Sequence, residues 1–261
     1  MKKKLYSLTL ALGMLGLLAI AAAGCGSDPK GAPVAAPQQQ DVQKTPPPPV
    51  QVTGKAIKDN GELLQLSLNI PVVGGMENRE IQSQINAAFE KYAAERKEAM
   101  AKGAGDFARE AKKQGFPFRP YELWTDYKVT YNKSGLLSLY TECYEYTGGA
   151  HGLTVRTQYN LSLNTGKEIA LGELFREGTD YKGIINQEIA RQISAEPNKF
   201  FPAGDMGFKT IADNQSFYFE EGGIVIYFGL YEIAPYASGI PEFKIPFALF
   251  KEGLNIDLAG Q

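Results

Sequence analysis

The sequence predicts an α+β fold: a mainly antiparallel sheet in two lobes, with a long helix and a second helix. Apolar and polar residues alternate over several segments after residue 50, and this period of two twice gives way to a period of three to four. Strands outnumber helices, and links of hairpin length favour antiparallel pairing, with the helices on one side of the sheet layers. We expect one globular module at 50–258, divided into lobes at 50–165 and 166–258.

The first lobe begins with two expected strands, at 50–57 and 62–73. Four apolar residues share one face of the second strand: Leu64, Leu66, Leu68 and Ile70. A long helix is expected over 77–114, because apolar residues recur there every three or four positions, at Ile81, Ile85, Phe89 and Tyr92. Gly103 and Gly105 are expected to break this helix in two.

Three strands are expected next, at 121–132, 136–146 and 153–163. The middle strand has an apolar side with Leu137, Leu139, Thr141 and Cys143, and a second side with Tyr140, Glu142, Tyr144 and Tyr146. An Asn-Thr-Gly turn at 164–166 follows the last of the three.

The second lobe is expected to hold a helix at 179–195, with an apolar stripe formed by Tyr181, Ile184 or Ile185, Ile189 and Ile193. Strands are predicted at 217–219 and 224–230, and the second of these has no polar face, so it should be central. Residues 231–239 should continue as a strand into a Pro/Gly turn.

The first 25 residues have the layout of a bacterial secretory signal. Three lysines precede an uncharged apolar run, and small residues then lead into Cys25. This order predicts a lipoprotein signal peptide at 1–24 and a lipid on Cys25 that holds the chain on the outer face of the cytoplasmic membrane. An uncleaved spanning helix and cleavage without lipid are the alternatives, and Ala22 stands where a leucine is usual. All three place residues 26–261 outside the cytoplasm.

Residues 25–49 are expected to form a disordered tether rich in proline and glutamine. Seven of the fifteen prolines fall at 26–50, so this segment cannot bury enough apolar surface to fold. Extended as polyproline II at about 3.1 Å per residue, it would reach roughly 75 Å. A proline-rich ligand for an aromatic groove is the alternative, but a spacer is the better interpretation directly after a lipid anchor.

Charge and cysteine content exclude several classes of protein. Residues 1–24 hold three lysines, so the remaining chain has 24 basic and 29 acidic side chains and a net charge near −5. This charge argues against nucleic acid as a partner and against a cationic grip on anionic lipid. With only Cys25 and Cys143 present, a disulfide framework is excluded. The sequence has no HExxH or CxxC motif, and we expect no metal and no cofactor.

His151 is the only histidine, and it lies in the loop Thr-Gly-Gly-Ala-His-Gly at 147–152. Gly148 and Gly149 could let a ligand approach the backbone beside an exposed imidazole. The alternative, which we favour, is a tight link whose glycines adopt positive φ, with His151 hydrogen-bonded to the loop. A hydrolase would have to combine His151 with scattered acids, because the sequence has no Gly-x-Ser-x-Gly elbow and Cys143 should be buried and inert. We expect no catalysis.

Tyrosines gather in two places, at 140–146 and near the C-terminal end at 227–236. Such rows can form a recognition surface with an apolar body and a polar tip. They can also be core residues covered by helices, which is the interpretation we favour. Three of them, with the histidine loop, are ligand-binding candidates: Tyr146, Tyr231 and Tyr236.

Several of these segments carry a family resemblance. The loop at 147–152, the strand and Asn-Thr-Gly turn after it, and residues 223–239 with their Ala-Pro-Tyr-Ala-Ser-Gly ending resemble a family of bacterial extracytoplasmic domains of unknown function. That family includes the outer domain of the lysozyme-sensing anti-sigma factor and a non-catalytic region of some peptidoglycan deacetylases. The resemblance covers roughly residues 50–250 and is strongest from 145 onward.

The resemblance implies a two-lobed α+β module that binds a ligand at the cell envelope and brings no catalytic residue. Peptidoglycan or another envelope glycan, or a wall-directed protein such as lysozyme, is the implied partner. Only Met1 to Lys4 precede the apolar run, where an anti-sigma factor needs a cytoplasmic segment, and no deacetylase domain is expected after the module. The sequence therefore predicts a tethered binding or sensor lipoprotein, with an envelope hydrolase as the alternative.

Overall fold

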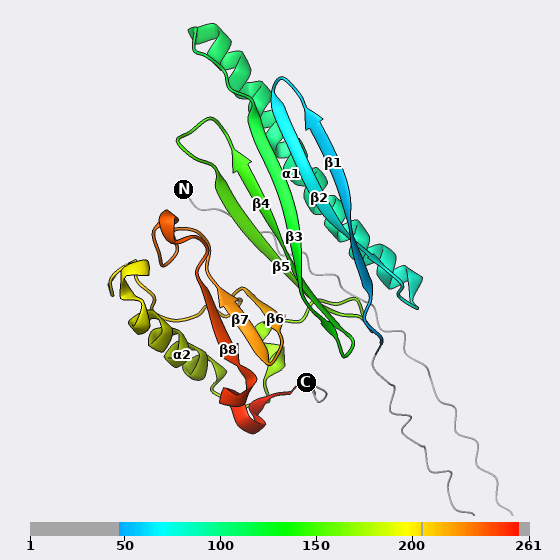
Figure 1. The fold of residues 1–261 in the computed structure, drawn as a ribbon, viewed down its shortest axis with the longest axis vertical. Coiled ribbons are helices and arrows are strands. Elements are labelled where there is room, and N and C mark those ends of the chain that lie inside the picture. Colours follow the sequence, from blue (N-terminus) through cyan, green and yellow to red (C-terminus); the bar gives the residue numbers. More distant parts are fainter. Residues whose placement is uncertain (1–46, 205, 256–261) are drawn as a thin grey trace, which may run out of the picture. The chain divides into compact units, whose positions relative to one another are not determined.

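The computed structural model describes residues 47–204 and 206–255, which form two sheets, each with its own helix (Figure 1). The expected signal peptide, Cys25 and most of the expected tether lie outside the described residues. In chain order the elements are β1 Gln51–Asn60, β2 Leu64–Gly74, α1 Arg79–Gln114, β3 Tyr121–Lys133, β4 Leu136–Tyr146, β5 Leu153–Ser162, α2 Tyr181–Ala195, β6 Phe217–Glu220, β7 Gly223–Tyr227 and β8 Glu242–Pro246. The predicted α+β class is confirmed.

The first sheet has the order β1-β2-β3-β4-β5, and α1 packs along one face of it (Figure 1). Its pairs are antiparallel except for β2 and β3, which run parallel. The expected hairpin link is therefore absent between β2 and β3. Helix α1 connects these two strands and carries the chain back, so that β3 starts at the same end of the sheet as β2. A parallel pair needs such a crossover. The predicted apolar face of β2 is confirmed: Leu64, Leu66, Leu68 and Ile70 are all buried.

Helix α1 is continuous over 36 residues, so the predicted break at Gly103 and Gly105 is wrong. The Asn78 side chain accepts from two backbone N–H groups at its start, and Gly115, with φ of 73°, ends it. Between the two glycines, Ala104 is completely buried in the core of the first sheet. A glycine costs a helix only about 1 kcal/mol relative to alanine, and packing on the sheet offsets that cost.

The second sheet has the order β6-β7-β8, and Ile185 and Ile189 of α2 are buried in its core. The predicted central position of β7 is confirmed. Residues 228–239 were expected to be strand and turn, but strand β7 ends at Tyr227 and the chain continues through turns into β8, which the sequence pattern did not predict. Pro235 lacks the N–H that a central strand would need.

Buried polar side chains join the two sheets. Ser138 Oγ donates to Asn160 Oδ1 over 2.7 Å and accepts from the backbone N–H of Phe219 over 3.0 Å. Asn160 Nδ2 donates to the carbonyl of Phe217 over 2.8 Å. These bonds hold β6 against β4 and β5, so the loop between β4 and β5 and the segment after β7 occupy defined positions.

Candidate functional site

The loop at 147–152 joins β4 to β5, and its glycines have different roles. Gly148 has a φ of 91°, in the region that favours glycine, and there is open space around it. Gly149 has ordinary contacts: a Cβ there would lie 3.8 Å from the His151 carbonyl oxygen. Gly152 is buried, and a Cβ there would lie 2.4 Å from the Tyr144 ring. Gly152 therefore allows the loop to pack directly on β4.

The imidazole of His151 is exposed and is held by two hydrogen bonds. Its Nδ1 lies 2.8 Å from the carbonyl oxygen of Gly152, so Nδ1 carries the proton and donates. Its Nε2 lies 3.3 Å from the Tyr231 hydroxyl. With Nδ1 protonated, Nε2 of the neutral ring accepts from that hydroxyl. His151 is thus a fixed ring whose polar atoms are both engaged.

Three of the predicted candidates come together at this loop. The rings of His151 and Tyr236 stack with centroids 4.2 Å apart and an interplanar angle of 26°. The centroids of Tyr231 and Tyr236 are 5.6 Å apart, and the Tyr236 hydroxyl donates to the Gly152 carbonyl over 3.1 Å. We call His151, Tyr231 and Tyr236 the aromatic loop surface.

The segment between β7 and β8 presents Tyr231 in a strained conformation. Tyr231 has a φ of 66°, in the left-handed region that costs a residue with a Cβ about 1–2 kcal/mol. The Glu232 carboxylate accepts from the backbone N–H of Gly229 over 2.7 Å and stabilises this turn. Tyr231 is 47% exposed. Residues held in such strained backbone conformations cluster at active sites and ligand-binding sites.

Three predicted candidates remain. Gly148 and Gly149 contribute only their backbone to the loop, and Tyr146 lies outside the aromatic loop surface. Tyr146 pairs with Glu122 across β3 and β4, is half-buried, and makes no ring contact with the aromatic loop surface among the described residues. Tyr140 and Tyr227 are buried and belong to a small core between the sheets. The tyrosine rows are therefore partly core and partly surface.

Arg156 of β5 is the main electrostatic link beside the site. Its guanidinium carbon lies 4.0 Å from the ring centroid of Tyr140 and 5.3 Å from that of Tyr227. It also pairs with Glu142 of β4, at 2.7 Å, and with Glu242 of β8. Burial lowers the pKa of Arg156, but its hydrogen bonds to Glu242 and Glu142 outweigh burial, and the net pKa is raised. Arg156 stays charged and connects both sheets.

Two features of the site speak against nucleophilic or general-base chemistry. Cys143 is buried, as predicted, and burial together with the nearby Glu145 carboxylate raises the pKa of its thiol to about 11. A thiol with that pKa is protonated at neutral pH and is a poor nucleophile. The His151 ring nitrogens bond to a carbonyl and a hydroxyl rather than to a carboxylate.

The predicted site residues did not include Trp124, Tyr144 or Gly152, although Tyr144 belongs to the predicted tyrosine row and Gly152 to the predicted histidine loop. Trp124 is 51% exposed on the face of β3 opposite Leu123, which is buried. The alternation along β3 was a signal that could have identified this exposed tryptophan. No sequence signal indicated that Gly152 would lie against Tyr144, because that contact depends on how the loop folds back on β4.

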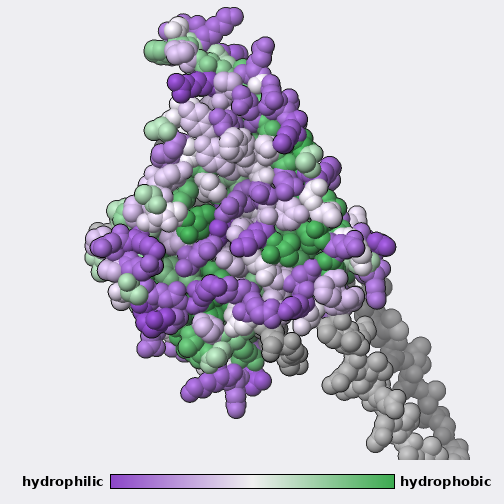
Figure 2. All heavy atoms as spheres, viewed as in Figure 1, coloured by the Kyte–Doolittle hydropathy of each residue, from purple (hydrophilic) through white to green (hydrophobic). Residues whose placement is uncertain are grey.

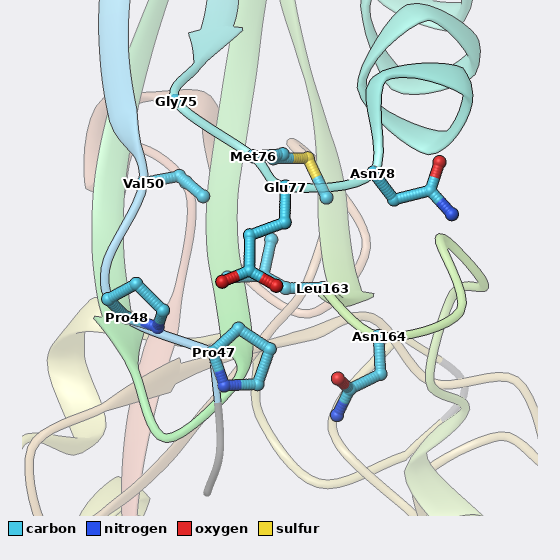
Figure 3. Close-up of a pocket in the computed structure, with 9 residues that line it drawn as sticks. All are labelled: Pro47, Pro48, Val50, Gly75, Met76, Glu77, Asn78, Leu163 and Asn164. Atoms are coloured by element: carbon cyan, nitrogen blue, oxygen red, sulfur yellow. The ribbon is translucent and has the colours of Figure 1, made fainter. Parts of the chain in front are cut away.

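A hollow of about 250 Å³ lies where the folded part begins (Figure 3). It is enclosed by residues 47–50, by the link between β2 and α1, and by the turn after β5, and the Glu77 side chain points across it (Figure 3). Asn132 holds Val50 beside it, accepting from the Val50 N–H over 3.1 Å and donating to its carbonyl over 2.7 Å. None of the predicted site residues lines this hollow.

Among residues 47–204 and 206–255, no three His, Cys, Asp or Glu side chains group closely enough to hold a metal ion. In the same ranges, neither α1 nor α2 combines the length and the apolar character that a membrane span requires.

Comparisons with known proteins agree with the resemblance seen in the sequence. The family "Deacetylase PdaC" matches residues 57–154, and the family "Protein of unknown function (DUF3298)" matches residues 172–248. The chain is 27% identical over 207 residues to the anti-sigma-V factor RsiV of Bacillus subtilis, covering 75% of this chain and 67% of that protein. It is 27% identical over 139 residues to the peptidoglycan-N-acetylmuramic acid deacetylase PdaC of the same organism, covering 51% of this chain but only 29% of the deacetylase.

Solved structures share the fold. A DUF3298 family member from Bacteroides fragilis superposes with a TM-score of 0.63 at 20% identity, covering 79% of this chain and 94% of its own. A DUF3298 family protein from Pseudomonas aeruginosa superposes with a TM-score of 0.53 at 18% identity, covering 80% and 95%. The predicted resemblance is confirmed: separate parts of this chain match the PdaC and DUF3298 family models, and the chain is similar to an anti-sigma factor and to part of a peptidoglycan deacetylase.

Proposed function

We propose that this chain is an extracytoplasmic binding or sensor lipoprotein that recognises a ligand of the cell envelope through the aromatic loop surface. Of the two ligand classes that the sequence suggests, a wall-directed protein such as lysozyme is favoured over an envelope glycan for this surface. The observation that carries the proposal is the stacking of His151 on Tyr236 beside the exposed Tyr231.

The shape and chemistry of this surface suit a protein partner. Tyrosine is enriched where proteins bind one another, because it offers a large apolar ring, a polar tip and little side-chain entropy to lose. The hydroxyl of Tyr236 and both ring nitrogens of His151 already have intramolecular partners. The surface is thus preorganised before any ligand arrives, which reduces the cost of binding.

A non-enzymatic role is favoured over the alternative of an envelope hydrolase. The relative matched over most of this chain is an anti-sigma factor, whereas the deacetylase is matched over a minor part of its length. A hydrolase using His151 as a general base would need a ring nitrogen directed at a nucleophile or a water molecule. The partners of His151 are instead the Gly152 carbonyl and the Tyr231 hydroxyl.

The cellular arrangement is part of the proposal. A signal peptide at 1–24 would direct export, a lipid on Cys25 would hold the chain on the outer face of the membrane, and a tether at 25–49 would carry the module, 50–258. Acyl chains supply roughly 0.8 kcal/mol per buried CH₂. The basis is the order of lysines, apolar run and cysteine in the sequence.

The anchoring is tested by Cys25→Ser in the producing cell. We expect the variant to leave the membrane fraction or to accumulate unprocessed, because lipid attachment requires the thiol. Fractionation and the mass of the mature N-terminus measure both outcomes. A variant that is cleaved after Gly24 and stays in the membrane fraction at the wild-type level would refute the lipid anchor.

The binding surface is tested by Tyr231→Ala and Tyr236→Ala, with lysozyme as the probe. We expect either change to weaken lysozyme binding about 10–30-fold, because truncating an aromatic residue at a binding hot spot costs about 2 kcal/mol. Phe116→Ala is the control: Phe116 is 63% exposed and lies outside the surface. Surface plasmon resonance gives the affinities and thermal melts verify folding.

The same measurement separates the ligand classes. Unchanged lysozyme affinity in a folded Tyr231→Ala, Tyr236→Ala double variant would remove this surface from the proposal. Binding to purified sacculi but not to lysozyme, lost in the same variants, would replace the protein ligand by a glycan. Turnover of peptidoglycan fragments that disappears in a folded His151→Ala variant would favour the hydrolase.

A further inference from the structure

The face of the first sheet that points away from α1 carries an aromatic pair in a hollow. In the cross-strand register, one row of four residues runs across four strands of this face: Ser67, Trp124, Tyr144 and Thr154. Trp124 and Tyr144 line a hollow of about 340 Å³ together with Asn69, Asp126 and Glu142. In Figure 1, α1 lies behind this sheet, so Figure 2 looks onto the open face, where pale atoms of intermediate hydropathy lie among purple hydrophilic ones.

The aromatic pair is exposed and held in place. Trp124 is 51% exposed, and its ring centroid lies 5.5 Å from that of Tyr144, with the planes tilted by 42°. The Tyr144 ring packs against the backbone of Gly152, where a Cβ would come within 2.4 Å. Tyr144 is therefore fixed between Trp124 and the loop, and the indole presents an apolar surface at the edge of the hollow.

Hydrogen-bonding groups surround this apolar surface. The Asn69 amide donates to the Asp126 carboxylate over 2.8 Å, and Asp126 is exposed. Glu142 accepts from Arg156 over 2.7 Å, and Arg156 is also paired with Glu242. Both carboxylates that line the hollow keep further acceptor capacity. No lysine or arginine lines the hollow within the part of the chain that the structure describes, and of these two carboxylates Arg156 reaches only Glu142, so Asp126 supplies the negative charge of the hollow.

From this arrangement we infer that the hollow is a saccharide-binding site for uncharged pyranose rings, separate from the aromatic loop surface. A pyranose has a C–H face that packs on an indole ring and equatorial hydroxyls that hydrogen-bond to carboxylates and amides at its edge. The Asp126 carboxylate, whose hydrogen-bond donor is the neutral Asn69 amide, disfavours uronic acids and other anionic sugars by like-charge repulsion. A hollow of about 340 Å³ has the volume of a small-ligand site.

Ligand binding at this site can be followed by tryptophan fluorescence, because Trp124 is the one tryptophan in the sequence. Titrating the full-length protein with cellotetraose and with N-acetylated chitotetraose should give a saturable change in tryptophan emission for at least one of them. Tetragalacturonate, which is anionic, should bind at least tenfold more weakly. An equal or stronger response to tetragalacturonate would overturn the assignment to uncharged sugars, and no response to any of the three would overturn the site.

Substitutions of Trp124 and Asp126 show whether these residues bind saccharide or only pack across the strands. Calorimetry measures the affinity of each variant. Trp124→Ala should weaken saccharide binding about tenfold or more, and Trp124→Phe less, because a ring remains. Asp126→Ala should weaken it about 3–10-fold for lost hydrogen bonds, while Phe116→Ala, outside the hollow, should leave it unchanged. If folded Trp124→Ala and Asp126→Ala proteins bind as the wild type does, the pair is merely structural. Tyr231→Ala should not affect this titration, so failure here and failure at the aromatic loop surface are distinguishable.

Discussion

Replacing Arg156 by alanine should lower the free energy of unfolding by about 2–4 kcal/mol. The side chain is only 8% exposed and pairs with Glu142 and Glu242, so the substitution leaves two carboxylates without their cation. Breaking a buried pair costs about 3–5 kcal/mol, and the expected value is smaller here because both carboxylates are 39% exposed. The cation–π contacts with Tyr140 and Tyr227 are lost as well.

A matched control is Arg191→Ala on α2. Arg191 is 68% exposed and pairs with Glu188 within one helix, so its removal should cost no more than about 0.5 kcal/mol. Arg156→Lys should fall between the two, because it keeps a charge but not the planar fork. Urea unfolding measures all three. A loss below about 1 kcal/mol for Arg156→Ala would show that the link between the sheets contributes little.

Most strands and both helices could be predicted because each carries its burial pattern within its own residues. Along β2 and β4 the alternation of apolar and polar residues records which face meets the core. Predictions failed where the outcome depends on distant packing. The break expected at Gly103 and Gly105 is absent because Ala104 packs into a core formed largely by the sheet. The parallel pairing of β2 and β3 follows from where α1 returns the chain.

The candidate site likewise has features that local sequence patterns predict and features that depend on distant packing. Glycine content marked the loop at 147–152 as unusual, and turn residues marked the segment containing Tyr231 and Tyr236. That these two segments meet depends on the junction between the sheets, where Ser138 and Asn160 connect β4 and β5 to β6. No local pattern encodes such a junction. The alternation along β3 could have indicated that Trp124 is exposed, but its pairing with Tyr144 requires the register of two strands.

Gly152→Ala should damage both the fold and the aromatic loop surface. The added methyl group would lie 2.4 Å from the Tyr144 ring and 2.6 Å from the backbone carbonyl oxygen of Glu145. The ring can move, but the carbonyl belongs to β4, so the loop must shift. Overpacking of this kind costs about 1–3 kcal/mol. The Gly152 carbonyl also accepts from His151 and from Tyr236, so a shifted loop separates both rings from their partner.

Gly149→Ala in the same loop is the control, because its methyl group would meet only the His151 carbonyl oxygen at an ordinary 3.8 Å. We expect Gly149→Ala to change stability by no more than about 0.5 kcal/mol and to keep the wild-type affinity for lysozyme. Gly152→Ala should melt several degrees lower and bind lysozyme at least tenfold more weakly, with altered Trp124 emission as Tyr144 moves. Thermal melts measure the stability of the two variants, surface plasmon resonance their affinity for lysozyme, and fluorescence their Trp124 emission. If both variants melt and bind alike, close packing of the loop on β4 is not what positions His151 and Tyr236.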